Sequence, residues 1–233
     1  MATEMQSHPR SDGSSLQIYR NGNHKYWVDG GEKNKAPSVT TLISHIDGDG
    51  FGAGMGWAMK MARQNDGDLT AAQRIGQASR DEGTHLHNAI HYYIATGGID
   101  EESDLFISWL QAVGDENTWL ASEQFVYSSH YLYGGTADAL SLHATDTAIW
   151  DWKTKNAESY DKYGGGSMKD QAQLAAYAMA LREMDSVYVP ERGFIAYIMR
   201  DQSGVDVVPV DLNKGWKLFL ASRSLYNLVR EGV

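Results

Sequence analysis

The sequence predicts a mixed α/β fold, with a central sheet flanked by helices and a helical region before the sheet. Apolar residues recur at helical spacing in the first half of the chain. The predicted helices there cover residues 56–63, 70–95 and 102–113. Aromatic and β-branched residues then dominate three consecutive runs, which is typical of adjacent strands. These runs are residues 119–129, 131–143 and 147–154.

The remaining elements follow from local signals. Residues 17–29 predict a hairpin that turns at Asn21-Gly22, and the stretch from Pro37 to Ile46 predicts a short helix capped by Ser38. Glycines at alternate positions from 48 to 56 indicate a flexible crossing.

The second half continues with an element that crosses the sheet. Residues 168–184 predict a strongly amphipathic helix, since Leu174, Tyr177, Ala178 and Leu181 share one face. Two strands and a last helix should then follow. They are expected at residues 188–200, 205–211 and 213–230.

We expect one domain over residues 1–233, because no repeat or proline-rich linker divides the chain. The first part, residues 1–16, is polar and is expected to be a loose leader. The rest divides into a helical region, a sheet core with its crossing helix, and a C-terminal helix. Their expected bounds are 37–116, 117–211 and 212–233.

Composition excludes several classes of protein. The chain has 233 residues and no cysteine, so disulfides, iron–sulfur clusters and a cysteine nucleophile are excluded. No apolar run reaches the length of a membrane span, and the N-terminus lacks the pattern of a signal peptide. These features predict a cytoplasmic protein without membrane contact.

The formal charge of −10 is concentrated in one segment. Residues 81–152 contain twelve acidic residues and no lysine or arginine, and they hold five of the eight histidines. The rest of the chain is slightly basic, with 20 basic and 18 acidic residues. A segment rich in carboxylate and imidazole but lacking cations is suited to a metal ion.

One pair of motifs in this segment fits metal-dependent phosphoryl chemistry. Asp138 and the sequence Asp151-Trp152-Lys153 lie on neighbouring predicted strands, so a hairpin can bring both carboxylates to one place. Residues at i and i+2 of a strand share a face, which sets Lys153 beside Asp151. Two carboxylates and an ammonium group suit Mg²⁺ and a phosphate.

Other motifs fail on inspection. The run Asp47-Gly48-Asp49-Gly50 begins like a calcium loop but has Phe51 at position five and no glutamate at position twelve. The spacing of His87 and His91 is that of zinc proteases, but Asn88 stands where those enzymes carry a glutamate base.

Four motifs in order carry a resemblance to a known family. They are G-T-x-x-H at 83–87, G-G-T-A-D at 134–138, D-W-K-T at 151–154 and Q-L-A-A-Y at 173–177. Together they resemble the RecB-like exonuclease branch of the PD-(D/E)xK nuclease superfamily. The early Pro-Ser-Val-Thr at 37–40 is similar to phage-encoded exonucleases and to the mitochondrial genome maintenance exonuclease.

The resemblance implies a restriction-endonuclease-like core and a role for each matching residue. His87, Asp138, Asp151 and the main-chain carbonyl of Trp152 would bind one or two Mg²⁺ or Mn²⁺ ions. Asp138, Asp151, Lys153, Gln173 and Tyr177 would form the catalytic group. Ala137 replaces the proline of the superfamily name, and no cysteines are present for the iron–sulfur cluster of several relatives.

Further residues are candidates on weaker grounds. Glu123, on the first strand of the sheet, is expected either to support the metal site or to form a salt bridge at the sheet edge. Gly83 is expected to allow the close approach of another backbone or a ligand. Possible DNA contacts are Ser38, Thr40, Arg74, Arg80, Thr154 and Lys155.

The sequence therefore predicts a Mg²⁺-dependent DNA exonuclease that acts on single strands or duplex ends in replication, recombination or repair. Two alternatives stay open. The same fold could serve a structure-specific DNA or RNA endonuclease, or a non-catalytic subunit that binds DNA ends. A recombinase or single-strand-binding protein is a possible partner, and a phage-encoded enzyme would work in a bacterial host cell.

Overall fold

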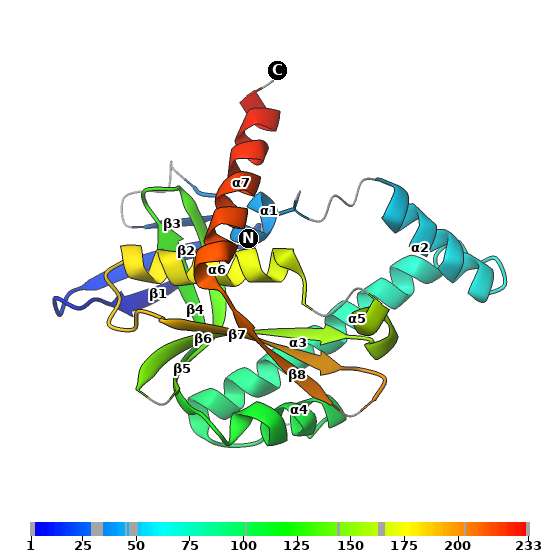
Figure 1. Cartoon of the computed structure of the whole chain (residues 1–233), viewed down its shortest axis with the longest axis horizontal. Helices are drawn as coiled ribbons and strands as arrows, with labels where there is room; N and C mark the ends of the chain where they lie inside the picture. The colour runs from blue at the N-terminus through cyan, green and yellow to red at the C-terminus, as the bar shows by residue number, and fades with distance from the viewer. Residues whose placement is uncertain are drawn as a thin grey trace.

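A five-stranded mixed sheet forms the centre of the computed structural model (Figure 1). The structure describes residues 3–28, 35–44, 46, 51–100, 102–143, 145–162, 166–202 and 204–231. The strand order is β4-β5-β6-β7-β8, with β6 and β7 parallel and the other neighbours antiparallel. The strands are β4 (Thr118–Ser128), β5 (Tyr133–His143), β6 (Asp146–Lys155), β7 (Arg192–Met199) and β8 (Val205–Val210). The mixed α/β class predicted from the sequence is confirmed.

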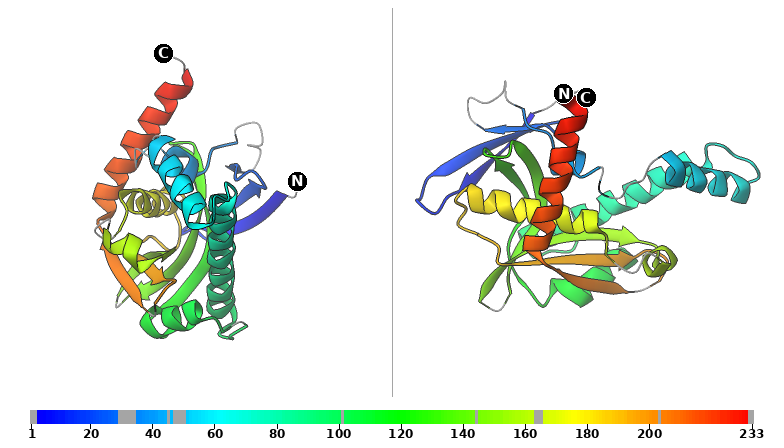
Figure 2. Two further views of the ribbon diagram at one scale, coloured as in Figure 1. Left: turned by 90° about the vertical axis from the view of Figure 1, so that its right-hand side faces the viewer. Right: turned by 45° about the horizontal axis from the view of Figure 1, so that its top comes forward.

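Helices cover both faces of this sheet, and each face has its own apolar core (Figures 1 and 2). Helix α6 (Met168–Glu183) crosses one face, with α7 (Leu212–Glu231) packed on its outer side. Helices α3 (Ala71–Thr96) and α4 (Asp104–Trp109) cover the other face, where α4 continues into a π-helical turn over Leu110–Gly114. Alternate strand residues serve the two cores: Ile149 contributes to the first and Trp150 to the second.

The prediction that α6 is amphipathic was wrong. Apolar and small residues are buried around most of its circumference, because the helix lies between the sheet and α7. The two helices approach so closely that a Cβ at Gly215 of α7 would lie 2.5 Å from the Gln171 carbonyl oxygen. Alanines such as Ala175 make this spacing possible.

The N-terminal residues are not a loose leader, so that prediction was also wrong. Strand β1 (Thr3–Pro9) pairs antiparallel with β2 (Ser15–Asn21), which pairs with β3 (Tyr26–Val28) to form a second sheet. Most side chains of β1 are exposed, which explains its polar sequence. Of its seven residues, His8 is the one that is fully buried. The predicted hairpin turn after Asn21 is confirmed, and its side chain accepts a hydrogen bond from the Lys25 amide.

The connecting helices differ from expectation in extent. Helix α1 (Val39–Leu42) has Ser38 as its cap, as predicted. Helix α2 (Phe51–Gln64) begins inside the glycine-rich stretch that was expected to be a flexible crossing; residues 47–50 lie outside the described residues. Alanine, methionine, lysine and arginine, which favour helices, outnumber the glycines there. Helix α5 (Ala157–Lys162) was not predicted.

Two parts of the chain lie outside the central sheet and its covering helices. Helix α2 and the first turns of α3 extend away from the central sheet, while β1–β3 lie against its β4 side (Figures 1 and 2). Within the described residues, no helix combines the length and the apolar character that crossing a membrane requires.

Candidate active site

Asp138 on β5 is tied to the backbone of the next strand. Its Oδ2 atom accepts a hydrogen bond of 2.8 Å from the Trp152 amide of β6. The two strands pair at Ala139 and Trp150, so the hairpin predicted from the sequence does place Asp138 beside the Asp151-Trp152-Lys153 segment. The side chain is 10% exposed, which leaves one edge of the carboxylate open to a ligand.

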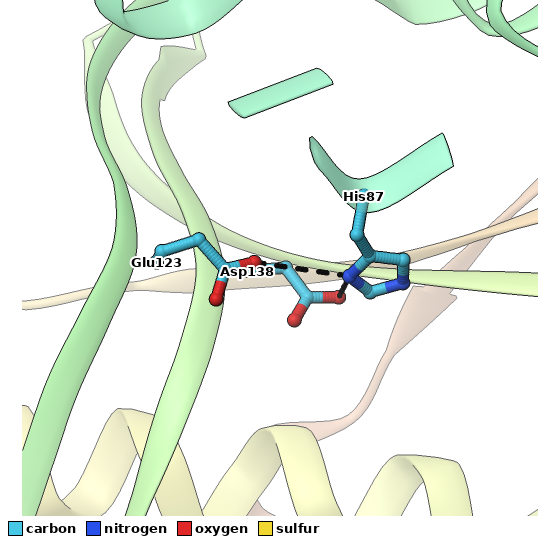
Figure 3. Close-up of side chains that lie close together, drawn as sticks. All are labelled: His87, Glu123 and Asp138. Atoms are coloured by element: carbon cyan, nitrogen blue, oxygen red, sulfur yellow. Dashed lines mark ion pairs between the residues drawn. The ribbon is translucent and has the colours of Figure 1, made fainter. Parts of the chain in front are cut away.

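His87 reaches the same place from helix α3. Its Nε2 atom lies 3.2 Å from the Trp152 carbonyl oxygen. A carbonyl can only accept, so Nε2 must carry hydrogen. The other ring nitrogen, Nδ1, faces Asp138 and Glu123, at 3.8 Å from a carboxylate oxygen of each (Figure 3). When the ring is neutral, Nδ1 therefore presents its lone pair toward two carboxylates.

Glu123 approaches from the edge strand β4. Its neighbours Ser122 and Gln124 pair with Ala139 and Ala137, which sets Glu123 opposite Asp138. The backbone of Glu123 has a positive φ of 52°, a conformation that costs a residue with a side chain on the order of 1–3 kcal/mol. Such strain is most often found at functional sites.

His87, Glu123 and Asp138 form what we call the three-ligand cluster. Each offers one ligand atom, and all three atoms lie within 4.8 Å of one another. Two ligands that bind one ion at about 2.1 Å can be at most about 4.2 Å apart, so small side-chain movements would let all three bind one divalent ion. The donor set of one imidazole and two carboxylates fits a metal centre.

Negative charge dominates the cluster. Burial by itself would lower the pKa of His87, but the charge of Asp138 and the interaction with Glu123 outweigh it and raise the pKa to about 9. A cation is therefore favoured at this position: the proton on His87 in the protein alone, or a metal ion in its place.

Asp151 and Lys153 form a separate unit, the Asp151–Lys153 pair. The Lys153 Nζ atom lies 2.6 Å from Asp151 Oδ2, and Gln173 Nε2 donates to Asp151 Oδ1 over 2.9 Å. Asp151 is only 1% exposed. The predicted metal set therefore divides: Asp151 is held by Lys153 and Gln173, and the Trp152 carbonyl contacts His87, whereas Glu123 joins His87 and Asp138.

Burial and charge act in opposite directions on this pair. Burial raises the pKa of Asp151, while the positive charge of Lys153 opposes that rise. Burial would lower the pKa of Lys153, but Asp151 and Asp138 raise it above its usual range. Lys153 therefore remains an ammonium ion at neutral pH, suited to attract a phosphate but not to accept a proton.

The two glycines of the G-G-T-A-D motif are required by close packing. A Cβ at Gly135 would lie 2.2 Å from the Tyr177 ring, and a Cβ at Gly134 would lie 2.4 Å from Tyr26. Tyr177 is buried against this strand, and its burial raises the pKa of its hydroxyl. Gly83 differs, because a Cβ there would meet only Thr154 Oγ1, at an ordinary 3.6 Å. Among the described residues no backbone lies close to Gly83, and the approach of a ligand there stays a prediction.

Most of the predicted DNA contacts have other partners in the structure. The Ser38 hydroxyl caps α1 and contacts Thr40, and the Thr154 hydroxyl accepts from Arg200. Arg74 forms an exposed ion pair with Asp68 at 3.6 Å. Lys155 ends strand β6.

Arg80 is placed differently, since it lines a cavity of about 580 Å³ beside the cluster. Residues from α3, β4 and the N-terminal sheet form the walls, among them His87, Glu123 and Arg20. Arg20 lies over the Phe125 ring, 4.6 Å from its centre, and donates to Thr136. Arg20 also forms an ion pair with Glu4. The cavity thus joins the three-ligand cluster to two cations.

Sequence reasoning did not identify three polar residues around the site: Gln6, Arg20 and Asp170. Gln6 lies on strand β1, which the sequence did not predict, and Arg20 lies on the predicted hairpin but in no recognised motif. Asp170 precedes Gln173 by three positions, so it lies on the same face of α6, and helical spacing could have found it. It is buried, accepts a hydrogen bond from Tyr197, and contributes to the raised pKa of Lys153.

Comparisons with known proteins gave structural neighbours only. No protein-family model matches the chain, and no curated protein matches it by sequence. Among solved structures, the exonuclease LHK-Exo in complex with dAMP matches with a TM-score of 0.43 and 12% identity, over 84% of this chain and 89% of that one. The protein SSO0001 matches with a TM-score of 0.39 and 16% identity, over 81% of this chain and 75% of that one. Function is therefore argued from the residues of the site.

Proposed function

We propose that this protein is a divalent-metal-dependent DNA exonuclease that hydrolyses phosphodiester bonds of single strands or duplex ends. The observation that carries the proposal is the three-ligand cluster, which lies one strand away from a lysine held as an ammonium ion. His87, Glu123 and Asp138 would hold Mg²⁺ or Mn²⁺. A divalent ion there would supply Lewis-acid polarisation of the phosphate and activation of water at neutral pH.

The chain's own groups divide the remaining work. Lys153 would attract the scissile phosphate and offset the negative charge that develops in the transition state. Asp151 contacts this ammonium group directly, and Gln173 donates to the same carboxylate and so holds Asp151 in position. The cavity beside the cluster could accept the backbone of a strand, with Arg20 and Arg80 available to its phosphates.

The proposal is tested on linear single-stranded and duplex DNA labelled at either end, and on circular single-stranded DNA. We expect the purified chain to degrade linear DNA when Mg²⁺ or Mn²⁺ is present, to stop when the ion is chelated, and to leave the circle intact. Cleavage of the circle would instead identify an endonuclease of the same fold. Absence of metal-dependent cleavage on every DNA and RNA substrate would overturn the proposal.

Single substitutions show whether the cleavage belongs to this site. Asp138→Asn and Lys153→Met should each lower the rate at least 100-fold, as expected when an essential electrostatic contact is removed. Asp146→Asn is a matched control, because Asp146 lies on the same sheet but pairs with Arg192 on the exposed surface. Full activity in Asp138→Asn would exclude the cluster as the reaction centre.

A further inference from the structure

Gln6, on the first strand of the chain, contacts the backbone of Glu123 and of Phe125. Its Nε2 atom donates to the Glu123 carbonyl over 2.7 Å, and its Oε1 atom accepts from the Phe125 amide over 2.7 Å. Gln6 precedes Glu123 by 117 positions in the sequence and Phe125 by 119. The Gln6 amide thus donates to residue 123 and accepts from residue 125, which is the pattern that a neighbouring parallel strand would provide.

Gln6 makes this contact at the outer edge of β4, where no other strand of the five-stranded sheet lies beside it. Strand β4 is the outer strand of the five-stranded sheet, so its free edge carries backbone groups that no strand of that sheet pairs. The Glu123 backbone is also held at a φ of 52°, which an unsupported glutamate rarely adopts. A conformation of this kind persists only where surrounding contacts fix it.

The direction of the Glu123 carboxylate depends on that backbone. Along a regular strand, successive side chains point to opposite faces, and a change of φ at one residue redirects its side chain. In the observed conformation the carboxylate lies 3.8 Å from His87 Nδ1 and completes the three-ligand cluster (Figure 3).

We propose that Gln6 is a positioning residue that holds the backbone of Glu123 in its left-handed conformation and so completes the metal site. The inference rests on the proposed function, because it assumes that the cluster binds a divalent ion. It gives the N-terminal sheet a role in the chemistry, because strand β1 (Thr3–Pro9) would then support the metal site.

The test measures Mn²⁺ binding by calorimetry, without any nuclease substrate. Gln6→Met keeps the length of the side chain but removes both hydrogen bonds. We expect it to weaken Mn²⁺ binding about tenfold, the lower end of the range for residues that orient metal ligands. Gln17→Met is the matched control. Gln17 lies on the adjacent strand, and among the described residues its side chain donates to Ser7 and Ser15, so its replacement should leave Mn²⁺ affinity unchanged.

A double-mutant cycle separates positioning from a general loss of structure. In a Glu123→Gln background, Gln6→Met should have little further effect on Mn²⁺ affinity, because the carboxylate it positions is absent. An equal loss in both backgrounds would overturn the inference, and so would equal affinities for Gln6→Met and Gln17→Met. If Gln6→Met fails to fold, Gln6→Asn replaces it, since that amide is one methylene too short to bridge both groups.

The outcomes also distinguish this inference from the proposed function. If the native chain binds Mn²⁺ and Gln6→Met binds it equally well, only the role of Gln6 is refuted. If the native chain binds no divalent ion, the metal centre and the positioning role are refuted together. If Mn²⁺ binds and depends on Gln6 but no substrate is cleaved, the inference holds and the exonuclease assignment is refuted.

Discussion

The three-ligand cluster, carried by α3, β4 and β5, and the Asp151–Lys153 pair, carried by the neighbouring strand β6, neutralise their charges differently. In the pair the carboxylate has its counter-charge within the chain: Asp151 is 1% exposed and has an ammonium group at 2.6 Å. The cluster is open, with Glu123 35% exposed, and two carboxylates face a single imidazole. The Asp151–Lys153 pair therefore balances its own charge, whereas the three-ligand cluster has more negative than positive charge.

This difference indicates separate functions for acidic residues that look alike in the sequence. A self-satisfied buried pair sets the position of Lys153 and resists change, because breaking it would leave a buried charge. An open cluster can exchange its proton for a metal ion, because its ligands are already gathered and its charge favours a cation. Perturbing each unit in turn should therefore give opposite effects on stability and on metal binding.

The largest expected effect comes from breaking the pair. Lys153→Met should lower the free energy of unfolding by about 3–5 kcal/mol, because it leaves the carboxylate of Asp151 buried without its cation. Glu123→Gln should change it by less than about 1 kcal/mol, since that carboxylate is partly exposed. Urea unfolding in the presence of a chelator measures both.

A double substitution is the control for this comparison. Asp151→Asn combined with Lys153→Met removes both charges, so it should recover most of the stability lost in Lys153→Met alone. Equal losses in the single and the double variant would show that packing, not charge, accounts for the effect.

The second effect is the pH dependence of the metal-free cluster. The pKa of His87 is raised from 6.5 to about 9, so its protonated form stabilises the fold fully below pH 6.5. That contribution is lost as the pH rises through about 9, and the shift sets an upper bound of about 3 kcal/mol. The stability difference between the native chain and His87→Gln should therefore shrink from pH 6.5 to 9.5.

His85→Gln provides the matched control for that measurement, because His85 is exposed on the same helix two positions earlier. Its stability difference from the native chain should stay constant over this range. A difference for His87→Gln that does not depend on pH would contradict the pairing with Asp138 and Glu123.

The third effect is stabilisation by metal. A ligand that binds only the folded state at 100 times its Kd adds about 2.7 kcal/mol to the free energy of unfolding. Mn²⁺ at that excess should stabilise the native chain by this amount and Asp138→Asn by much less. Asp146→Asn, at the exposed end of β6, should respond like the native chain. A full response in Asp138→Asn would place the ion elsewhere.

The sequence predicted the frame of the site but not its division into two units. Strand periodicity placed Asp138 on β5 and Asp151 on β6, and the spacing of two residues put Lys153 beside Asp151. These inferences need only local geometry. The place of Glu123 in the cluster, by contrast, goes with a backbone φ of 52° that no strand pattern predicts.

That angle depends on contacts that no local pattern reveals. Gln6 reaches Glu123 across 117 residues, from a strand that the sequence shows only as a polar leader. The strand was missed because it exposes most of its side chains and lacks the apolar alternation that predicts a strand. Helix α6 was misjudged for a different reason: spacing within the helix indicated one apolar face, but α7, distant in the sequence, covers its outer side.

The smallest expected effect concerns the strained backbone of residue 123 and is the difference in stability between Glu123→Gly and Glu123→Ala. Both lose the carboxylate and with it the cluster, so neither should respond to Mn²⁺ as the native chain does. Glycine adopts a φ of 52° without the steric cost that alanine pays there, while it loses more chain entropy on folding. The steric cost for alanine exceeds the additional entropy loss for glycine, so Glu123→Gly should be more stable than Glu123→Ala by about 1 kcal/mol. Urea unfolding resolves a difference of this size, and a more stable Glu123→Ala would mean that position 123 relaxes into a regular strand once its side chain is removed.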